Sequence, residues 1–583
     1  MISDRIKQLR LLMEQNSVDF CFYTDRDAHQ SEYTPDFAKK RSYISGFTGS
    51  NGTVLILKDQ AYLWTDGRYY IQAEKELQNS GITMMKMESG VKSFYEILKE
   101  EFKSSASVRV STDNSAMSVA TMERLKSELK NMDVEFIDED LLDRVWNERP
   151  VKNNSNPFIL NIEYTGERAL DKIQRIRKVF DTKADYLLVT TLDDIVWITN
   201  TRGSDIKFSP VNLSWMLIGK DQTTIYMDGA EKLENYFLSE NIQLKNYLDI
   251  YNDLSSLENC KVAVDKNSTN SKLFFALSKA EIVEFTNPVQ KLKACKNPTE
   301  ITNIKDALKM EAASLVRFQK WLYQNVGKVT ETEAAEKLKE FRAMFDKYIY
   351  DSFEAISAYK SNAAMMHYSS YKNPDTIIGD DSFYLIDTGG NYLSGTTDLT
   401  RTFQLGEVSD IMKRHYTLVL KSHINLARSK YLKGTSAHAM DILARQPIWN
   451  EHLDYKCGTG HGVGMFINVH EGPQNFSQHF SYVELEEGMV TTIEPGIYLE
   501  GLYGIRIENM YHSTYSGESE FGKFMKFDVM NFNPIDTKPI VKEMLSTEEI
   551  EWLNNYHGKC YEVLSPLLNE DEKEFLREVT KGI

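Results

Sequence analysis

Five side chains in the C-terminal half of the chain have types and an order that could bind metal ions. They are Asp387, Asp398, His461, Glu494 and Glu508. Each carboxylate alone would more often be an ordinary strand-end or turn residue, but all four lie among apolar residues, where a buried charge is costly unless something neutralises it. Two divalent cations would balance four carboxylates, and a hydroxide bridging the cations would complete a hydrolytic centre.

Four short strands are expected to bring these carboxylates together. They are predicted over residues 383–387, 395–403, 489–494 and 504–509. Asp387 would end the first strand and Glu494 the third, whereas Asp398 and Glu508 would lie within the second and fourth. Paired strands lie only about 5 Å apart, so hairpins would place the carboxylates side by side. Antiparallel hairpins flanked by helices indicate an α+β domain.

His461 would supply a nitrogen ligand to the same centre. It stands in the segment Gly458-Thr-Gly-His-Gly-Val-Gly464, whose glycines would let the backbone pass close to the metals and the substrate. Oxygen-rich ligation with one imidazole fits manganese, and also cobalt, iron or zinc.

The composition is that of a globular protein with several domains. A chain of 583 residues is too long for one core, so roughly two to four domains are expected. The net charge of −17 repels phosphate backbones and argues against nucleic acid as a partner. Five widely spaced cysteines favour a reducing compartment. No secretory or membrane-spanning segment is predicted, so we expect a soluble intracellular protein.

Three domains are expected, over residues 1–152, 153–292 and 293–583. The segment 147–156 is rich in Asn, Ser and Pro, which favours a linker. Near the second boundary, Asn297 can cap a helix, Pro298 suits its first position, and Glu300 falls at the third. A helix is therefore expected to open the third domain.

The first two domains begin alike. A helix-like stretch at 5–10 precedes an apolar strand candidate at 19–23, and the stretch at 172–177 precedes a similar one at 186–190. Each then reaches a predicted loop with two aspartates: Asp25 and Asp27, then Asp193 and Asp194. We interpret this as an internal duplication of an α/β unit, the alternative being chance similarity of two amphipathic helices.

The ligand order resembles that of the pita-bread metallopeptidases, and more closely the three-domain cytosolic type of Xaa-Pro aminopeptidase (aminopeptidase P). In the catalytic part the resembling stretches are 385–402, 458–473, 493–496 and 504–509. Elsewhere they are 27–33, 45–49, 64–69, 192–197, 202–205, 534–538 and 552–557. The resemblance implies two creatinase-like N-terminal α/β domains followed by a pita-bread catalytic domain with a C-terminal extension.

The resemblance also assigns the metal ligands. It implies that Asp387, Asp398, His461, Glu494 and Glu508 bind two divalent metal ions, with Asp398 and Glu508 bridging both. Manganese is the metal that it favours.

Other residues gain a role at the substrate from the same resemblance. His367 and His470 would bind substrate and stabilise charge at the scissile bond, and Glu494 would carry the proton. His461 and Glu494 would also contact substrate, and Arg68 matches a substrate-contacting arginine. From the residues alone, the two histidines could equally be structural, and Arg68 could be a turn residue in Asp66-Gly-Arg68.

The implied activity is hydrolysis of the N-terminal Xaa-Pro bond of peptides, by a cytoplasmic homodimer. The alternatives are a prolidase-type dipeptidase and a metal-free pita-bread binding module. One position departs from the family pattern: close relatives usually have His-Gly-Thr-Gly-His where this chain has Cys457-Gly-Thr-Gly-His461. We interpret Cys457 as a small buried packing residue.

Overall fold

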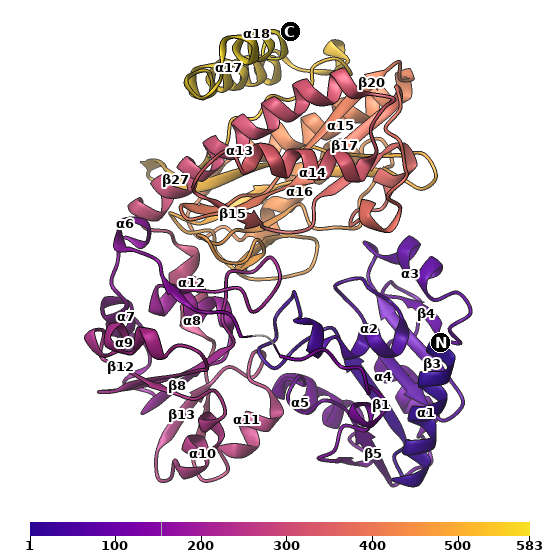
Figure 1. Ribbon diagram of the computed structural model, residues 1–583, viewed down its shortest axis with the longest axis vertical. Coiled ribbons are helices and arrows are strands. Elements are labelled where there is room, and N and C mark those ends of the chain that lie inside the picture. The colour runs from indigo at the N-terminus through magenta and orange to yellow at the C-terminus, as the bar shows by residue number, and fades with distance from the viewer. Residues whose placement is uncertain (153) are drawn as a thin grey trace. The chain divides into compact units, whose positions relative to one another are not determined.

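The computed structural model describes residues 1–152 and 154–583 and divides into two compact units (Figure 1). Unit 1 comprises Met1–Ile159 and Glu167–Val289, and unit 2 comprises Leu160–Gly166 and Gln290–Ile583. The described part of the expected linker, 147–152 and 154–156, contains no helix or strand. Residue 153, where the second domain was expected to begin, lies outside the described residues. The bounds predicted for the three domains stay a prediction.

Unit 1 contains two six-stranded sheets with the same topology. The first has the order β4 (Thr83–Lys86), β3 (Ala61–Thr65), β2 (Thr53–Leu57), β1 (Phe20–Thr24), β5 (Ser107–Ser111), β6 (Asp133–Phe136). The second has the order β12 (Ile242–Lys245), β11 (Thr223–Met227), β10 (Ser214–Gly219), β8 (Tyr186–Val189), β13 (Lys261–Val264), β14 (Glu281–Glu284). In both, the central strand pairs antiparallel on one side and parallel on the other.

The expected duplication is therefore confirmed at the level of structure. Each central strand follows an amphipathic helix, α1 (Ile2–Gln15) before β1 and α7 (Ala169–Phe180) before β8. One detail of the prediction is wrong, because Asp193 and Asp194 do not lie in a loop. They occupy the first turn of helix α8 (Leu192–Thr199), where carboxylates are favoured by the exposed backbone N–H groups.

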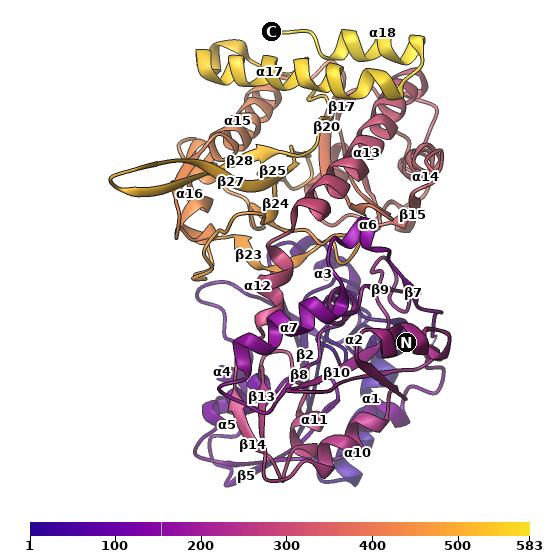
Figure 2. The same cartoon turned by 90° about the vertical axis from the view of Figure 1, so that its left-hand side faces the viewer.

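Unit 2 is built on two main sheets. An antiparallel three-stranded sheet has the order β16 (Ile356–Tyr359), β17 (Asp381–Thr388), β20 (Leu399–Gly406). A six-stranded sheet has the order β21 (Lys430–Leu432), β28 (Gly522–Val529), β27 (Asn509–Ser519), β24 (Val490–Ile493), β22 (Gly460–Gly462), β23 (Glu471–Phe476), and Figure 2 shows its long β27–β28 hairpin. Smaller sheets join β15 (Tyr348–Asp351), β18 (Gly390–Tyr392), β19 (Gly395–Thr396), and β25 (Gly496–Leu499) with β26 (Tyr503–Arg506).

Helices bury the apolar faces of these sheets. They are α13 (Pro298–Asn325), α14 (Glu331–Arg342), α15 (Asp410–Ala427), α16 (Ala437–Trp449), α17 (Thr547–Leu564) and α18 (Glu570–Val579). The last of them, α18, packs against α13 and α17. The predicted start of α13 is confirmed: Asn297 and Glu300 form a reciprocal capping box, with Pro298 at the first position. The predicted α+β class is confirmed as well.

The core of unit 2 shows on which face of β17 Asp387 lies. Phe318 and Leu322 of α13 pack with Tyr384 and Ile386, which are alternate residues of β17. Side chains alternate between the two faces of a strand, so Asp387 lies on the opposite face from Ile386.

Among the described residues, no helix combines the length and the apolar character needed to cross a membrane.

Candidate metal centre

Three of the four carboxylates lie at places where the strand pattern is interrupted. Asp387 lies inside β17, opposite Thr400 of β20. Asp398 lies between β19 and β20, and Glu508 lies between β26 and β27, so neither is inside a strand as predicted. Glu494 directly follows β24.

The chain changes sheets at Asp398 and again at Glu508. β19 pairs with β18 whereas β20 pairs with β17, and β26 pairs with β25 whereas β27 pairs with β24. The prediction of single strands over 395–403 and 504–509 was wrong because apolar alternation does not show with which neighbour each half of a segment pairs. Both residues consequently lie near Asp387 of β17, and Glu508 also lies near Glu494, which follows β24.

Two groups of side chains could each hold a cation, and they share Glu508. In the first, one ligand atom each from Asp387, Asp398 and Glu508 lie within 4.8 Å of one another. In the second, the same holds for His461, Glu494 and Glu508. The five predicted ligands therefore converge on one place.

A third group adds a histidine that the resemblance assigned to substrate. Ligand atoms of Asp398, His461 and His470 also lie within 4.8 Å of one another. The rings of the two histidines are 4.3 Å apart between centroids and nearly perpendicular, at 81°. His470 therefore lies at the edge of the centre.

The orientation of His461 suits a metal ligand. Its Nδ1 lies 2.9 Å from the Gly462 carbonyl oxygen, which fixes the proton on that nitrogen. Its Nε2 faces the carboxylates, 3.4 Å from Asp398 Oδ2 and 3.4 Å from Glu494 Oε1. Burial lowers the pKa of His461, but the hydrogen bond to Asp398 and the charges of Glu494 and Asp398 outweigh burial and raise the pKa to about 9.

The crowded carboxylates repel one another. Burial raises the pKa of Glu508 well above its ordinary value, and the charges of Asp398, Glu494 and Asp387 raise it further. Burial is also the main cause of the raised pKa of Glu494 and of Asp387. Such a cluster is stable only if cations or protons compensate it.

One fixed cation in the cluster was missed by the sequence reasoning. Arg506 donates hydrogen bonds to Asp387 Oδ2 at 2.5 Å, to the Tyr498 hydroxyl at 2.6 Å and to Thr400 Oγ1 at 3.0 Å. The Thr400 hydroxyl in turn donates to Glu508 Oε2 at 2.7 Å. The argument used for the carboxylates, a charge within a buried apolar run, could have found Arg506 as well.

The remaining charge and donors fit two divalent cations. With His461 neutral, Arg506 leaves three of the four carboxylate charges uncompensated, which one divalent cation cannot neutralise. Two such cations leave one positive charge, which favours an anionic oxygen nucleophile. Asp387 Oδ1 is buried without a hydrogen-bond partner in the described structure, as expected of an atom that a cation would bind. Carboxylate oxygens with imidazole suit manganese, iron, cobalt or zinc.

The glycines around His461 serve neighbouring strands. A Cβ atom on Gly460 would lie 2.0 Å from the carbonyl oxygen of Thr492 in β24. One on Gly462 would lie 2.2 Å from the carbonyl oxygen of Glu471 in β23. The close approach expected of these glycines is therefore to backbone on both sides of β22, and it fixes the position of His461.

Cys457 is partly buried and packs against the large apolar cluster of unit 2. Its carbonyl oxygen accepts a hydrogen bond from Arg445 at 2.8 Å. The expected packing role fits this environment, although the side chain is less buried than predicted.

His367 lies in the loop between the 3-10 helices η4 (Lys360–Ala364) and η5 (Ser370–Lys372) and is partly exposed. The backbone of η4 is in close contact with β26: a Cβ atom added to Gly504 of β26 would lie 1.8 Å from the Ala363 carbonyl oxygen of η4. The loop with His367 is thus held next to the strand that precedes Glu508. The role of His367 stays a prediction.

Arg68 lies in unit 1, after β3. It donates from Nε and Nη2 to the two carboxylate oxygens of Asp66, at 2.9 and 2.7 Å. This bidentate pair holds the guanidinium in one orientation. Its predicted contact with substrate stays a prediction.

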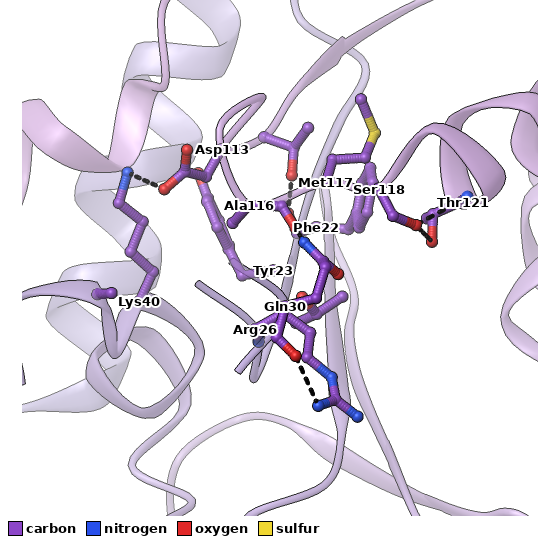
Figure 3. Close-up of a pocket in the computed structure, with 13 residues that line it drawn as sticks. Phe22, Tyr23, Arg26, Gln30, Lys40, Asp113, Ala116, Met117, Ser118 and Thr121 are labelled. Atoms are coloured by element: carbon purple, nitrogen blue, oxygen red, sulfur yellow. Dashed lines mark hydrogen bonds and ion pairs between the residues drawn. The ribbon is translucent and has the colours of Figure 1, made fainter. Parts of the chain in front are cut away.

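A small cavity in unit 1 does not offer a comparable site. Figure 3 shows Lys40 paired with Asp113 at its edge, and the Arg26 guanidinium donating to the Gln30 carbonyl oxygen. Lys40 also pairs with Asp140 and Asp143, so its charge is already neutralised. At about 50 Å³ the cavity has room for a few water molecules but not for a peptide.

Comparison with known families divides the chain into four matched regions. Residues 302–514 match metallopeptidase family M24, and residues 523–583 match the C-terminal region of peptidase M24. Residues 5–145 and 148–300 each match the creatinase/prolidase N-terminal domain. The two creatinase-like domains and the pita-bread domain expected from the sequence are therefore all present.

Individual relatives match over almost the whole chain. A probable Xaa-Pro aminopeptidase P from Sordaria macrospora is 35% identical, covering 98% of this chain and 97% of its own length. Aminopeptidase P1 from Arabidopsis thaliana is 32% identical, with coverages of 100% and 99%.

Two solved structures resemble the chain, one along its full length and one over part of it. X-prolyl aminopeptidase from Caenorhabditis elegans, described as a cytosolic enzyme with a di-nuclear active site, is 31% identical, with a TM-score of 0.95 and full coverage of both chains. The Xaa-Pro dipeptidase from Bacillus anthracis is 24% identical, with a TM-score of 0.52, and it covers 63% of this chain and 99% of its own. The second likeness shows the fold alone.

Proposed function

Because the chain belongs to the Xaa-Pro aminopeptidase P family of metallopeptidases, we propose that unit 2 removes the N-terminal residue from peptides with proline in second position. One observation supports this most strongly: the two ligand groups that share Glu508. A binding module that has lost its metals would have no need to keep four largely buried carboxylates together.

The chain's own residues have distinct roles in the proposed reaction. When bound, two divalent cations supply the charge that activates water and polarises the scissile carbonyl. Glu494 carries the proton from the attacking water to the proline nitrogen, which has no hydrogen of its own and needs one to leave as an amine. The place of Glu494 directly after β24, with Oε1 3.4 Å from His461 Nε2, supports this role.

Two histidines would stabilise the charge that develops at the scissile bond. His470 is supported by its place beside His461, and His367 by a loop held against β26. Hydrogen-bond donors aimed at a developing oxyanion are a major source of rate enhancement. His461 and Glu494 would also contact the substrate, as would Arg68, which Asp66 holds in one orientation.

The metal, the assembly and the compartment are further parts of the proposal. Manganese is the proposed metal, because oxygen-rich ligation with imidazole suits it. A homodimer in the cytoplasm is proposed from the family and from the cytosolic enzyme of C. elegans, which this chain matches along its full length.

A prolidase-type dipeptidase is the main alternative, and one assay separates the two. Manganese-loaded protein is incubated with Arg-Pro-Pro and, separately, with Gly-Pro. Release of arginine from the tripeptide supports the proposal, whereas cleavage of the dipeptide alone would show a prolidase. Absence of both metal uptake and cleavage would show a binding module. Glu494→Gln serves as the negative control, because loss of the proton-carrying carboxylate should lower kcat by about 10²- to 10⁴-fold.

A further inference from the structure

A buried cluster of charges lies directly next to His470 in the chain. Glu471, the first residue of β23, accepts a hydrogen bond from Lys296 at Oε1, and Lys293 Nζ lies 3.7 Å from its Oε2. The three side chains are at most 1% exposed. The ammonium groups of both lysines thus face this carboxylate in a place that excludes water, where a poorly placed ion pair would be costly.

The two lysines belong to the segment through which the chain enters unit 2, just before α13. This segment is fixed to the loop before β24. Lys296 donates its backbone N–H to the Gly488 carbonyl oxygen at 3.1 Å, and the backbones of Cys295 and Met489 form an isolated antiparallel β-bridge. The lysines are therefore held by backbone contacts that do not involve Glu471.

Glu471 is fixed at the other end as well. It pairs with Gly462 of β22, and the Gly462 backbone approaches its carbonyl oxygen so closely that no Cβ would fit. The loop between these two residues ends on His470, whose ring lies against His461. The backbone position of Glu471 therefore constrains where the His470 ring lies.

We propose that Lys296 and Lys293 are positioning residues for the reaction, which hold Glu471 and thereby keep His470 against the metal centre. The inference rests on the proposed function, in which His470 contacts the substrate. A displacement of about 1 Å at such a group can lower the rate by about 100-fold. The lysines themselves do not touch the reacting atoms.

A double-mutant cycle with His470 tests the proposal. Lys296→Met is expected to lower kcat/KM for Arg-Pro-Pro by about 10- to 100-fold, mainly through kcat, while the protein still binds two manganese ions per chain. In a His470→Ala background the same substitution should lower kcat/KM by less than about 3-fold, because its target has gone. Glu471→Gln, which keeps the shape of the side chain, carries the same test if Lys296→Met does not fold.

The chain offers a matched control in the same segment. Lys291 pairs with Glu486 at 2.9 Å, but its side chain is 59% exposed and neither partner is next to a histidine of the site. Lys291→Met should leave kcat/KM within about 2-fold, as expected for an exposed ion pair.

Equal losses from Lys296→Met in both backgrounds would overturn the inference, because they would show a general structural effect. An unchanged kcat/KM in Lys296→Met would overturn it as well. If His470→Ala alone has no effect, the role of His470 in the proposed function fails, and the inference fails with it.

Discussion

Removal of the metal ions is expected to make the stability of the protein fall as the pH rises above neutrality. Without metal, the His461 imidazolium lies against Asp398 and Glu494, whose interactions outweigh burial and raise its pKa to about 9 from 6.5. A histidine whose pKa is raised on folding contributes stability that is fully present below the unfolded pKa. This contribution is lost as the pH rises through the folded pKa, so the window runs from about 6.5 to about 9.

The size of the effect follows from the shift. At about 1.4 kcal/mol per pKa unit, the change at His461 corresponds to about 3 kcal/mol. Burial lowers the pKa of His423 to about 3 and that of His557 to about 4, so these buried histidines titrate below the window. Glu508 acts in the same direction as His461: its raised pKa keeps a proton on the folded protein, which costs stability as the pH rises above the unfolded value of 4.5.

Urea denaturation at a series of pH values measures this effect. The free energy of unfolding of metal-free protein should fall by about 3 kcal/mol or more between pH 6.5 and 9, and saturating manganese should remove the fall. His461→Gln should make the metal-free fall smaller by about 3 kcal/mol. A metal-free stability that does not change over this window, or a fall that His461→Gln leaves intact, would refute the reasoning.

Four further substitutions test the surroundings of the centre. Arg506→Met should lower the free energy of unfolding of metal-free protein by about 3–5 kcal/mol, measured with urea, because Asp387 loses its buried partner. Thr400→Val should weaken manganese binding by about 10- to 100-fold in a chelator competition, because Glu508 loses a hydrogen bond. Thr402→Val, whose hydroxyl donates to the Arg506 carbonyl oxygen, should change this affinity by less than about 3-fold. Gly504→Ala should lower stability by about 1–3 kcal/mol and raise KM for Arg-Pro-Pro, because the new methyl group would displace η4 and the loop with His367.

Local features of the fold could be predicted from the sequence because they depend on neighbouring residues. The Asn297–Glu300 capping box spans three positions, and the start of α13 lies where it was expected. The duplication of the α/β unit was visible because a helix and a strand repeat in the same order. In unit 2 the chain passes from one sheet to another at Asp398 and at Glu508. Which sheet each strand joins depends on partners far away in the sequence, so the apolar alternation around these residues could not show it.

The candidate site was likewise predictable where a local pattern marks its residues, but not where distant residues meet. The five candidate ligands were singled out because charges in apolar runs are rare, and their order resembles a known family; the structure brings them together. The same rule covers Arg506, which was overlooked. The pair of Lys296 and Glu471 spans 175 residues of the chain, and no local pattern relates the two residues. Such contacts need the three-dimensional structure.

Anomalous diffraction from manganese-loaded crystals tests the central claim most directly. We expect two manganese peaks in each chain, one bound by Asp387, Asp398 and Glu508 and the other by His461, Glu494 and Glu508, with Asp398 also in contact with the second ion. A single peak held by Asp398, His461 and His470, or peaks elsewhere, would contradict a two-metal centre that shares Glu508.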